Sequence, residues 1–322
     1  MAQVVVTGAA GMIGSHVVER LVARGEKVVG VDSLVTGELA NLVGVLGSDR
    51  FEFVERDAAD LDHLPAGTAA VLHLASPASP RHFRDLPVEV LHAGSTVTLR
   101  LLDQAERAGA TFLFASSSEV YGEPEVHPQP EEYRGSVSTL GERACYDEAK
   151  RFSEAAVDTY RLRRGLDTRI ARIFNTYGPR MRLDDGRIVV TFVQQALAGH
   201  PLTVHGDGMQ TRSFCYVDDL ADGIVALLDS DVVVPVNLGT TEEYTVLDIA
   251  RMVIDLTGSD SAIEFVARPE NDPSRRRPDL TRARELLGWE PTVPVDDGMR
   301  RTVAAIAAQL GAAVGASEVP GP

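Results

Sequence analysis

A tyrosine and a lysine four residues apart, Tyr146 and Lys150, form the most chemically distinctive pair in this chain. The 322 residues include seven tyrosines but only two lysines, so chance would rarely give this spacing. On a helix, residues four apart share a face. An ammonium group there can favour the ionised phenol and lower a pKa that starts at about 10. Such a phenol can take a proton from a sugar hydroxyl while a nicotinamide takes the hydride. The alternative is an ordinary contact on a helix surface.

A run of hydroxyl side chains precedes this pair. The strand-like residues 111–115 lead into Ser116, Ser117 and Ser118, followed by Glu119. A loop with turn-forming hydroxyls would explain the run without any catalysis. A strand-end hydroxyl combined with a helical Tyr-x-x-x-Lys motif is, however, the arrangement found in the extended short-chain dehydrogenases/reductases. We therefore expect Ser117, Tyr146 and Lys150 to act together.

The N-terminal segment predicts a dinucleotide site. A buried strand at 3–7, a glycine turn, a helix over 15–23 and a second strand ending at Asp32 follow in the order that such a site requires. The turn residues expected to contact the cofactor are Gly8, Gly11, Met12, Ile13 and Gly14. Glycines allow a tight turn and close approach to a diphosphate at the helix N-terminus. Asp32 should bond the ribose hydroxyls and repel a 2′-phosphate, so NAD is favoured over NADP.

Strands and helices continue to alternate after this unit. Strands are expected at 51–55, 70–75 and 111–116, with helices near 88–108 and 147–164. This alternation predicts an α/β fold with a Rossmann-type doubly wound parallel sheet. Further cofactor contacts are expected where strands end, from Asp57, Ala58, Leu74, Ala75 and Ser76. His73 is better explained as a strand-end histidine bonded to backbone than as a catalytic group.

The composition excludes several classes of protein. A net charge of −16 argues against nucleic-acid binding, which needs a basic face. The sequence has no apolar run of about 18 residues, so we expect no membrane span. Its strand-like start predicts no signal peptide, and two cysteines do not make a disulfide framework or a zinc site. A cytoplasmic protein is the simplest interpretation. Arginines that could gather around an anionic substrate are Arg180, Arg182, Arg187, Arg212, Arg275, Arg276 and Arg277.

Within the extended short-chain superfamily, residues 3–300 most resemble the UDP-glucuronate decarboxylases (UDP-xylose synthases). The segments that carry the resemblance include Ser76–Pro80, Ser118–Gly122, Arg143–Glu148, Arg172–Met181, Asp185–Arg187 and Arg276–Asp279. The resemblance implies that Tyr146, with Lys150 and Ser117, deprotonates the sugar C4 hydroxyl as hydride passes to NAD⁺. The C4 ketone stands β to the C6 carboxylate, so CO₂ can leave. Protonation at C5 and return of the hydride would give UDP-xylose without a metal, because the ketone is the electron sink.

The same resemblance implies roles for other residues. Ser118 and Glu119 match sugar-contacting and acid/base positions, and Arg276 matches an arginine that meets the sugar carboxylate as a proton donor or an orienting group. If that match fails, Arg276 is part of a solvated basic run. The remaining expected substrate contacts are Pro77, Asn175, Arg187, Val190 and Arg212. A cofactor domain over 1–175, completed by 213–239, would pair with a smaller C-terminal α/β substrate domain over 176–212 and 240–311. Residues 312–322 are expected to be an unstructured tail, and relatives of this kind commonly form homodimers.

Three departures from the family pattern fall near the expected sugar site. Phe83 replaces a tyrosine, residues 94–98 lack an asparagine, and Glu142 replaces a proline. A nucleotide-sugar epimerase acting on a UDP-, GDP- or dTDP-sugar by the same C4 chemistry is therefore the nearest alternative. A 4,6-dehydratase would have an Asp-Glu pair where this chain has Ser118-Glu119. A non-catalytic NAD-binding scaffold is the alternative from another class.

Overall fold

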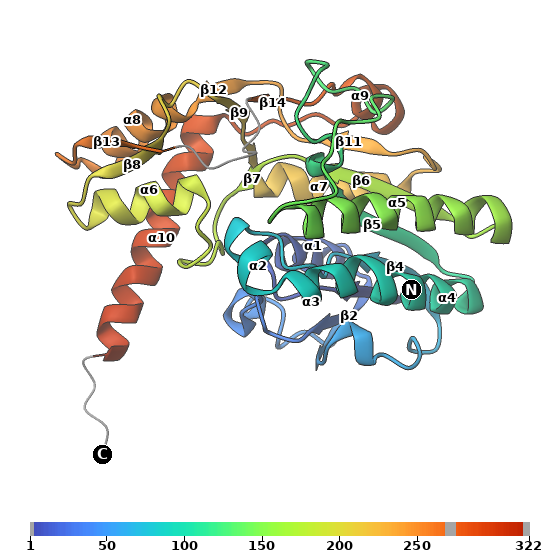
Figure 1. Cartoon of the computed structure of the whole chain (residues 1–322). Helices are drawn as coiled ribbons and strands as arrows, with labels where there is room; N and C mark the ends of the chain where they lie inside the picture. The colour runs from blue at the N-terminus through green and yellow to red at the C-terminus, as the bar shows by residue number, and fades with distance from the viewer. Residues whose placement is uncertain (1–2, 268–274, 318–322) are drawn as a thin grey trace.

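A seven-stranded parallel sheet forms the centre of the computed structural model, which describes residues 3–267 and 275–317 (Figure 1). Across the sheet the strands run β11-β6-β5-β4-β1-β2-β3, and each strand is parallel to its neighbours. In chain order they are β1 (Gln3–Thr7), β2 (Lys27–Asp32), β3 (Phe51–Glu55), β4 (Thr68–His73), β5 (Thr111–Ser117), β6 (Thr168–Ile173) and β11 (Val236–Leu238). The order reverses between β1 and β4, as in a doubly wound fold. The predicted fold class is confirmed.

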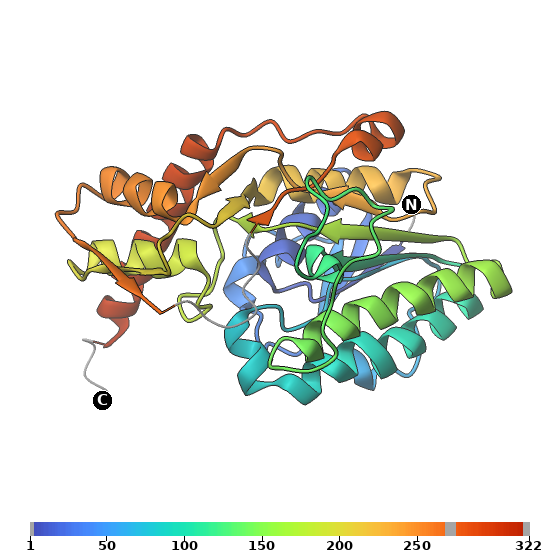
Figure 2. The same cartoon turned by 45° about the horizontal axis from the view of Figure 1, so that its top comes forward.

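Helices cover both faces of this sheet (Figures 1 and 2). One face carries α1 and α7, and the other carries α4 and α5. Their bounds are α1 (Met12–Ala23), α7 (Val217–Asp229), α4 (Thr98–Ala108) and α5 (Ala144–Arg164). Because side chains alternate along a strand, Val4 and Val6 pack under the first pair while Val5 packs under the second. Both faces are therefore apolar, as the β-branched runs predict.

The helix expected over 88–108 contains a π-helical turn. It consists of α3 (Pro87–His92), η3 (Ala93–Val97) and α4, preceded by the short α2 (Pro80–Asp85). At the turn Gly94 lies against α5: a Cβ on Gly94 would be 2.6 Å from the Cβ of Ala149. The hydroxyl of Ser153 donates to the carbonyl of Gly94 over 2.6 Å. The irregular turn thus lets the two helices touch one turn beyond Tyr146, and such turns are frequent near functional sites.

The C-terminal half of the chain forms a smaller lobe with its own hydrophobic core. Its strands pair as β8 with β13, β7 with β10, and β12-β9-β14. Their bounds are β7 (Thr176–Tyr177), β8 (Leu202–His205), β9 (Thr211–Ser213), β10 (Cys215–Tyr216), β12 (Glu243–Thr245), β13 (Ile263–Val266) and β14 (Arg275–Arg276). The helices are α6 (Ile188–Leu197), α8 (Val246–Thr257) and α10 (Val295–Ser317), which contribute to the second core. The helix α9 (Thr281–Leu287) instead packs against α7 and β11 of the first lobe.

The last helix is longer than the sequence indicated. We expected an unstructured tail from residue 312, but α10 continues through Ser317. The stretch from Gly311 to Ser317 contains no proline, and its three alanines favour a helix although its two glycines do not. The rest of the predicted tail, 318–322, lies outside the described residues. Within the described chain, no helix combines the length and apolarity needed to cross a membrane.

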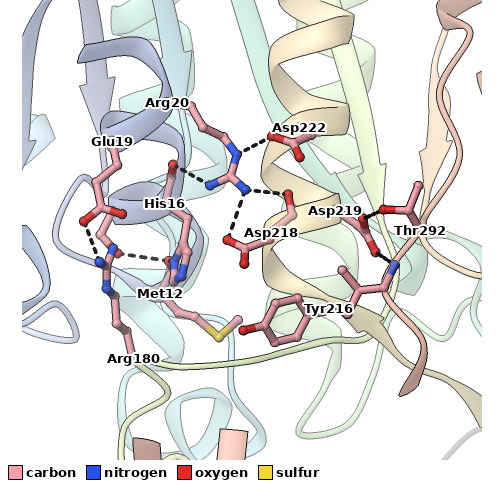
Figure 3. Close-up of polar contacts among 12 residues, drawn as sticks. Met12, His16, Glu19, Arg20, Arg180, Tyr216, Asp218, Asp219, Asp222 and Thr292 are labelled. Atoms are coloured by element: carbon pink, nitrogen blue, oxygen red, sulfur yellow. Dashed lines mark hydrogen bonds and ion pairs between the residues drawn. The ribbon is translucent and has the colours of Figure 1, made fainter. Parts of the chain in front are cut away.

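Charged contacts anchor α1, the helix that begins at the glycine turn (Figure 3). Arg20 donates to Asp218 over 3.0 Å and also pairs with Asp222, both on α7. Glu19, one residue earlier, pairs with Arg180 from the segment after β7. These contacts fix α1 both to α7 and to the segment that leads into the second lobe.

Candidate active site

The glycine turn between β1 and α1 has the shape and donors that a dinucleotide requires. Gly8 has a φ of +74°, and a Cβ there would lie 2.7 Å from the backbone nitrogen of Ala75. A Cβ on Gly14 would lie 2.0 Å from the carbonyl oxygen of Gly8. Gly11, at the helix N-cap, has no side chain to occupy the first N–H groups of α1, and that turn holds no acid. These N–H groups and the helix dipole suit a diphosphate.

Asp32 closes this turn from the end of β2. Its carboxylate accepts the N–H of Ala10 over 2.9 Å and that of Leu34 over 2.9 Å. Burial raises the pKa of Asp32, while these two bonds act in the opposite direction. An acid fixed beside the glycine turn fits the ribose of a dinucleotide. Residues present in the chain therefore fit NAD at both the diphosphate and the ribose.

Tyr146 lies on the first turns of α5 and is 7 % exposed. Its ring stacks on Phe83 of α2, with centroids 4.6 Å apart and planes inclined by 24°. The side chain of Ser117, the last residue of β5, lies near the Tyr146 hydroxyl and favours the ionised phenol. The structure thus brings together the strand-end serine and helical tyrosine that the sequence singled out. Phe83 keeps the aromatic contact although it lacks the hydroxyl expected at that position.

Lys150 lies one turn along α5 and is 5 % exposed. Its Nζ donates to the carbonyl of Ala115 over 2.8 Å and is 5.5 Å from the centre of the Tyr146 ring. Burial lowers the pKa of Lys150 to about 7, against the opposing charge of Glu154. Burial likewise raises the pKa of Tyr146 to about 12, although Ser117 opposes this. Burial thus places this pKa above that of a free phenol, opposite to the direction expected from the neighbouring ammonium group.

Glu119 and Arg276 form the opposite side of the site. Arg276, from β14 of the second lobe, is 1 % exposed, and its Nη2 lies 3.0 Å from the Glu119 carboxylate. Its Nη1 donates to the carbonyls of Ser118 and Gly122, each over 2.9 Å. Burial alone would raise the pKa of Glu119, but Arg276 and Arg143 hold it at about 2. Glu119 is therefore an ionised acceptor, and Arg276 is not part of a solvated run.

Asp147 is a buried acid that the sequence did not single out. It follows Tyr146, is 8 % exposed, and its Oδ1 has no hydrogen-bond partner among the described residues. Burial, reinforced by the charge of Glu119, raises the pKa of Asp147 to about 7. Only its place beside Tyr146 in the Tyr-x-x-x-Lys motif could have drawn attention to it.

The arginines expected to gather around an anionic substrate separate into two groups. Arg187 acts on the pKa of Tyr146, and Arg212 and Arg276 act on that of Glu119. Arg180 and Arg182 instead pair with nearby acids of the protein. Arg187 is itself held by Asp185, with its Nε 2.6 Å from the carboxylate.

Other predicted residues lie along the same edge of the sheet or at the start of the second lobe. Leu74, Ala75, Ser76 and Pro77 follow β4 and are half-buried, and Asp57 caps η2 (Ala58–Asp60) by accepting the N–H of Ala59 over 2.8 Å. Asn175 is half-buried between β6 and β7. Val190 is fully buried in the second core, so only its backbone can face a nucleotide. His73 bonds Thr7 over 2.8 Å and the carbonyl of Ala93 over 3.3 Å, which supports the structural interpretation.

Comparisons with known proteins agree with this geometry. UDP-glucuronic acid decarboxylase 1 of Xenopus tropicalis is 46% identical over 301 residues, which cover 94% of this chain and 71% of that protein. The Arabidopsis thaliana protein of the same name is also 46% identical, covering 94% and 69%. Among solved structures, UDP-glucuronic acid 4-epimerase of Bacillus cereus, in complex with UDP-glucuronic acid and NAD, has a TM-score of 0.87 at 29% identity, covering 95% and 99%. A dTDP-glucose 4,6-dehydratase of Streptomyces venezuelae, with NAD bound, has a TM-score of 0.88 at 28% identity, covering 96% and 98%.

A family model also matches most of the chain. It covers residues 4–239, which include the glycine turn, Ser117, Tyr146 and Lys150. Together with the fold and the geometry at the edge of the sheet, this match shows that the chain belongs to the NAD dependent epimerase/dehydratase family.

Proposed function

We propose that this enzyme converts UDP-glucuronate to UDP-xylose and CO₂ through a transient ketone at C4 of the sugar. The observation that carries the proposal is the 46% identity, over 94% of the chain, to a UDP-glucuronic acid decarboxylase. The site geometry supports it, because Tyr146 lies beside Ser117, and the buried Arg276 pairs with Glu119 just after the same strand.

In the proposed reaction the ionised phenol of Tyr146 takes the proton of the C4 hydroxyl, with Ser117 beside both oxygens. NAD⁺, when bound, supplies the hydride acceptor at C4 and returns the hydride at the end of the cycle. The C4 ketone lies β to the carboxylate, so the C5–C6 bond breaks, CO₂ leaves, and the electron pair remains as an enolate. Protonation at C5 then completes the exchange of a carboxylate for a hydrogen.

The remaining residues hold the reactants. For NAD we propose Gly8, Gly11, Met12, Ile13, Gly14, Asp32, Asp57, Ala58, Leu74, Ala75, Ser76, Tyr146 and Lys150. For the nucleotide sugar we propose Pro77, Ser118, Glu119, Asn175, Arg187, Val190, Arg212 and Arg276, with residues 176–212 and 240–311 forming the substrate domain. Arg276 is always charged and already bonded to backbone carbonyls, so we assign it to orientation of the sugar rather than to proton donation.

We also propose a homodimer and a cytoplasmic location. Exposed apolar residues on α3 and α5, namely Val88, Leu91 and Phe152, support a partner over these adjoining helices. Light scattering should give twice the 34.6 kDa chain mass, and Phe152→Glu should reduce it to one chain mass. For the location, the support is that Cys145 and Cys215 are both free thiols.

The function is tested with purified protein, NAD⁺ and UDP-glucuronate, by measuring CO₂ release and the mass of the nucleotide sugar. Conversion to a UDP-pentose supports decarboxylation. A product of unchanged mass but altered stereochemistry would identify an epimerase instead. Absence of reaction with UDP-, dTDP- and GDP-sugars, in a protein that binds NAD, would leave the scaffold alternative.

A further inference from the structure

Glu154 lies on α5 one turn after Lys150, and its carboxylate is fixed by two neighbouring strands. The hydroxyl of Ser116 on β5 donates to it over 2.5 Å. Arg172 on β6 binds both carboxylate oxygens, with Nε at 2.9 Å and Nη2 at 2.7 Å. The Glu154 side chain is 13 % exposed. A carboxylate held by a hydroxyl and a bidentate guanidinium has little freedom to move.

These contacts and those of Lys150 dock α5 onto consecutive residues of β5. Lys150 Nζ donates to the carbonyl of Ala115, and the next residue, Ser116, donates to Glu154. Ser117, which lies beside the Tyr146 hydroxyl, follows directly. The position of the helix relative to the reacting hydroxyl is therefore set at Ala115 and Ser116, just before the strand reaches the site.

Among the titratable groups near Lys150, Glu154 is the acid that favours its charged form. On its own helix Tyr146 adds no charge as a phenol, and the phenolate that takes the C4 proton would favour the ammonium group in the same sense as Glu154. From β4, His73 has its pKa lowered to about 3 by burial, and further by the charge of Lys150, so it is neutral too. Glu154 shares a helix face with Lys150 and opposes the effect of burial on its pKa.

The groups on the other side of Glu154 complete the network. Arg172 Nη1 also donates to the hydroxyl of Tyr121 and to the carbonyl of Glu131, each over 2.9 Å. Glu131, Arg172 and Glu154 line a cavity of about 440 Å³. Arg172 thus orients the carboxylate from the strand side, one helical turn along α5 from Lys150.

We propose that Glu154 is a positioning residue that keeps the ammonium group of Lys150 charged and docked beside Tyr146, with Ser116 and Arg172 holding its carboxylate in place. This role rests on the proposed function only for its effect on turnover. Its effect on Lys150 is a property of the protein and can be measured without substrate.

The two lysines of the chain make a direct test possible. Protein labelled with ¹³C at lysine Cε, saturated with NAD⁺, should give two lysine signals, which Lys27→Arg assigns. Lys27 is exposed at the start of β2 and serves as an internal reference. In Glu154→Gln, which keeps the side-chain size and removes the charge, the titration midpoint of Lys150 should fall by about one pH unit while that of Lys27 stays fixed. An unchanged Lys150 midpoint would overturn the proposal.

Two further variants separate charge from folding. Glu106→Gln removes a carboxylate that pairs with Arg164 at the far end of α5, and it should leave Lys150 unchanged. If Glu154→Gln does not fold, Glu154→Asp keeps a carboxylate one carbon further from Lys150, so the titration midpoint of Lys150 should fall by less. No fall in this midpoint would count against the role.

Turnover gives the second measurement. Because Lys150 must stay protonated for turnover, the alkaline limb of the kcat–pH profile of Glu154→Gln should move to lower pH. On that limb kcat should be about tenfold below the wild-type value, and it should recover as the pH is lowered. An equal loss at every pH would show a merely structural role and overturn the assignment. If the wild type does not convert UDP-glucuronate, the proposed function fails while the lysine titration still decides the role of Glu154.

Discussion

The ring of Phe83 stacks on the ring of Tyr146, with 4.6 Å between their centroids. Arg143 completes this arrangement, since its guanidinium carbon lies 5.7 Å from the centre of the Phe83 ring. The stack fixes the phenol from the ring face and leaves its hydroxyl to Ser117. The orientation of the reacting oxygen therefore depends on the ring contact as well as on the helix.

Tyr146→Phe should separate binding from chemistry. The variant keeps the ring that stacks on Phe83, so we expect normal folding and normal NAD affinity. It loses the hydroxyl that takes the C4 proton, so kcat should fall by roughly 10²–10⁴-fold. Product formation and a fluorescence titration with NADH measure the two effects. Near-normal turnover would exclude Tyr146 as the base.

Asp32→Asn should weaken the preference for NAD over NADP. Asparagine keeps a single acceptor oxygen, so the N–H of either Ala10 or Leu34 loses its partner. The ribose hydroxyls of NAD⁺ also lose a charged acceptor, which costs roughly 1.5–3 kcal/mol of binding free energy, or about tenfold or more in Kd. Repulsion of a 2′-phosphate also disappears, so the ratio of the two dissociation constants should approach one. Asp62→Asn, at a side chain that is 82 % exposed, is the matched control and should change neither constant.

Asp147→Asn should stabilise the protein above neutral pH. Burial raises the pKa of Asp147 from 3.8 to about 7, so between these values the folded state binds more protons than the unfolded state. The free energy of unfolding of the wild type therefore falls as pH rises through this window. The variant lacks this cost, and its Tm should exceed that of the wild type more at pH 8 than at pH 5. Glu148→Gln, at a neighbouring side chain that is 37 % exposed, should show no such trend; an Asp147→Asn difference independent of pH would contradict the account.

Gly94→Ala should disturb α5 through the π-helical turn. The added methyl group would lie 2.6 Å from the Cβ of Ala149, so the helices must move apart, at a cost of roughly 1–3 kcal/mol in the free energy of unfolding. Because α5 carries Tyr146, kcat should fall as well. At Gly47 a Cβ would meet nothing within 4 Å, so Gly47→Ala is the control. Thermal unfolding and product formation measure both; equal behaviour of the two variants would show that the contact at Gly94 is unimportant.

Much of the cofactor lobe could be predicted from local patterns. The strand, glycine turn and Asp32 occur within a short stretch, and the spacing of Tyr146 and Lys150 survives in any helix. The π-helical turn at Gly94 could not be predicted, because it arises from packing against Ala149 rather than from propensity. The predicted direction of the Tyr146 pKa shift was also wrong, because a sequence shows the charge of Lys150 but not the burial of both groups.

The second side of the site was harder to anticipate. Glu154 and Asp147 lie on the same helix as Tyr146, yet their roles depend on partners from distant segments, such as Arg172 for Glu154. Arg276 was found through resemblance to relatives, while its burial and its bonds to Ser118 and Gly122 come only from the fold.

The guanidinium of Arg276 has a consequence for protein engineering. It belongs to the C-terminal half but completes the backbone hydrogen bonding of the loop after β5, so the first half is not a self-sufficient module. A chimera that grafts a foreign second half onto residues 1–175 would have to supply an arginine at the same point. Otherwise the carbonyls of Ser118 and Gly122 would lose this donor, and Glu119 would keep Arg143 but lose the second of its two arginines.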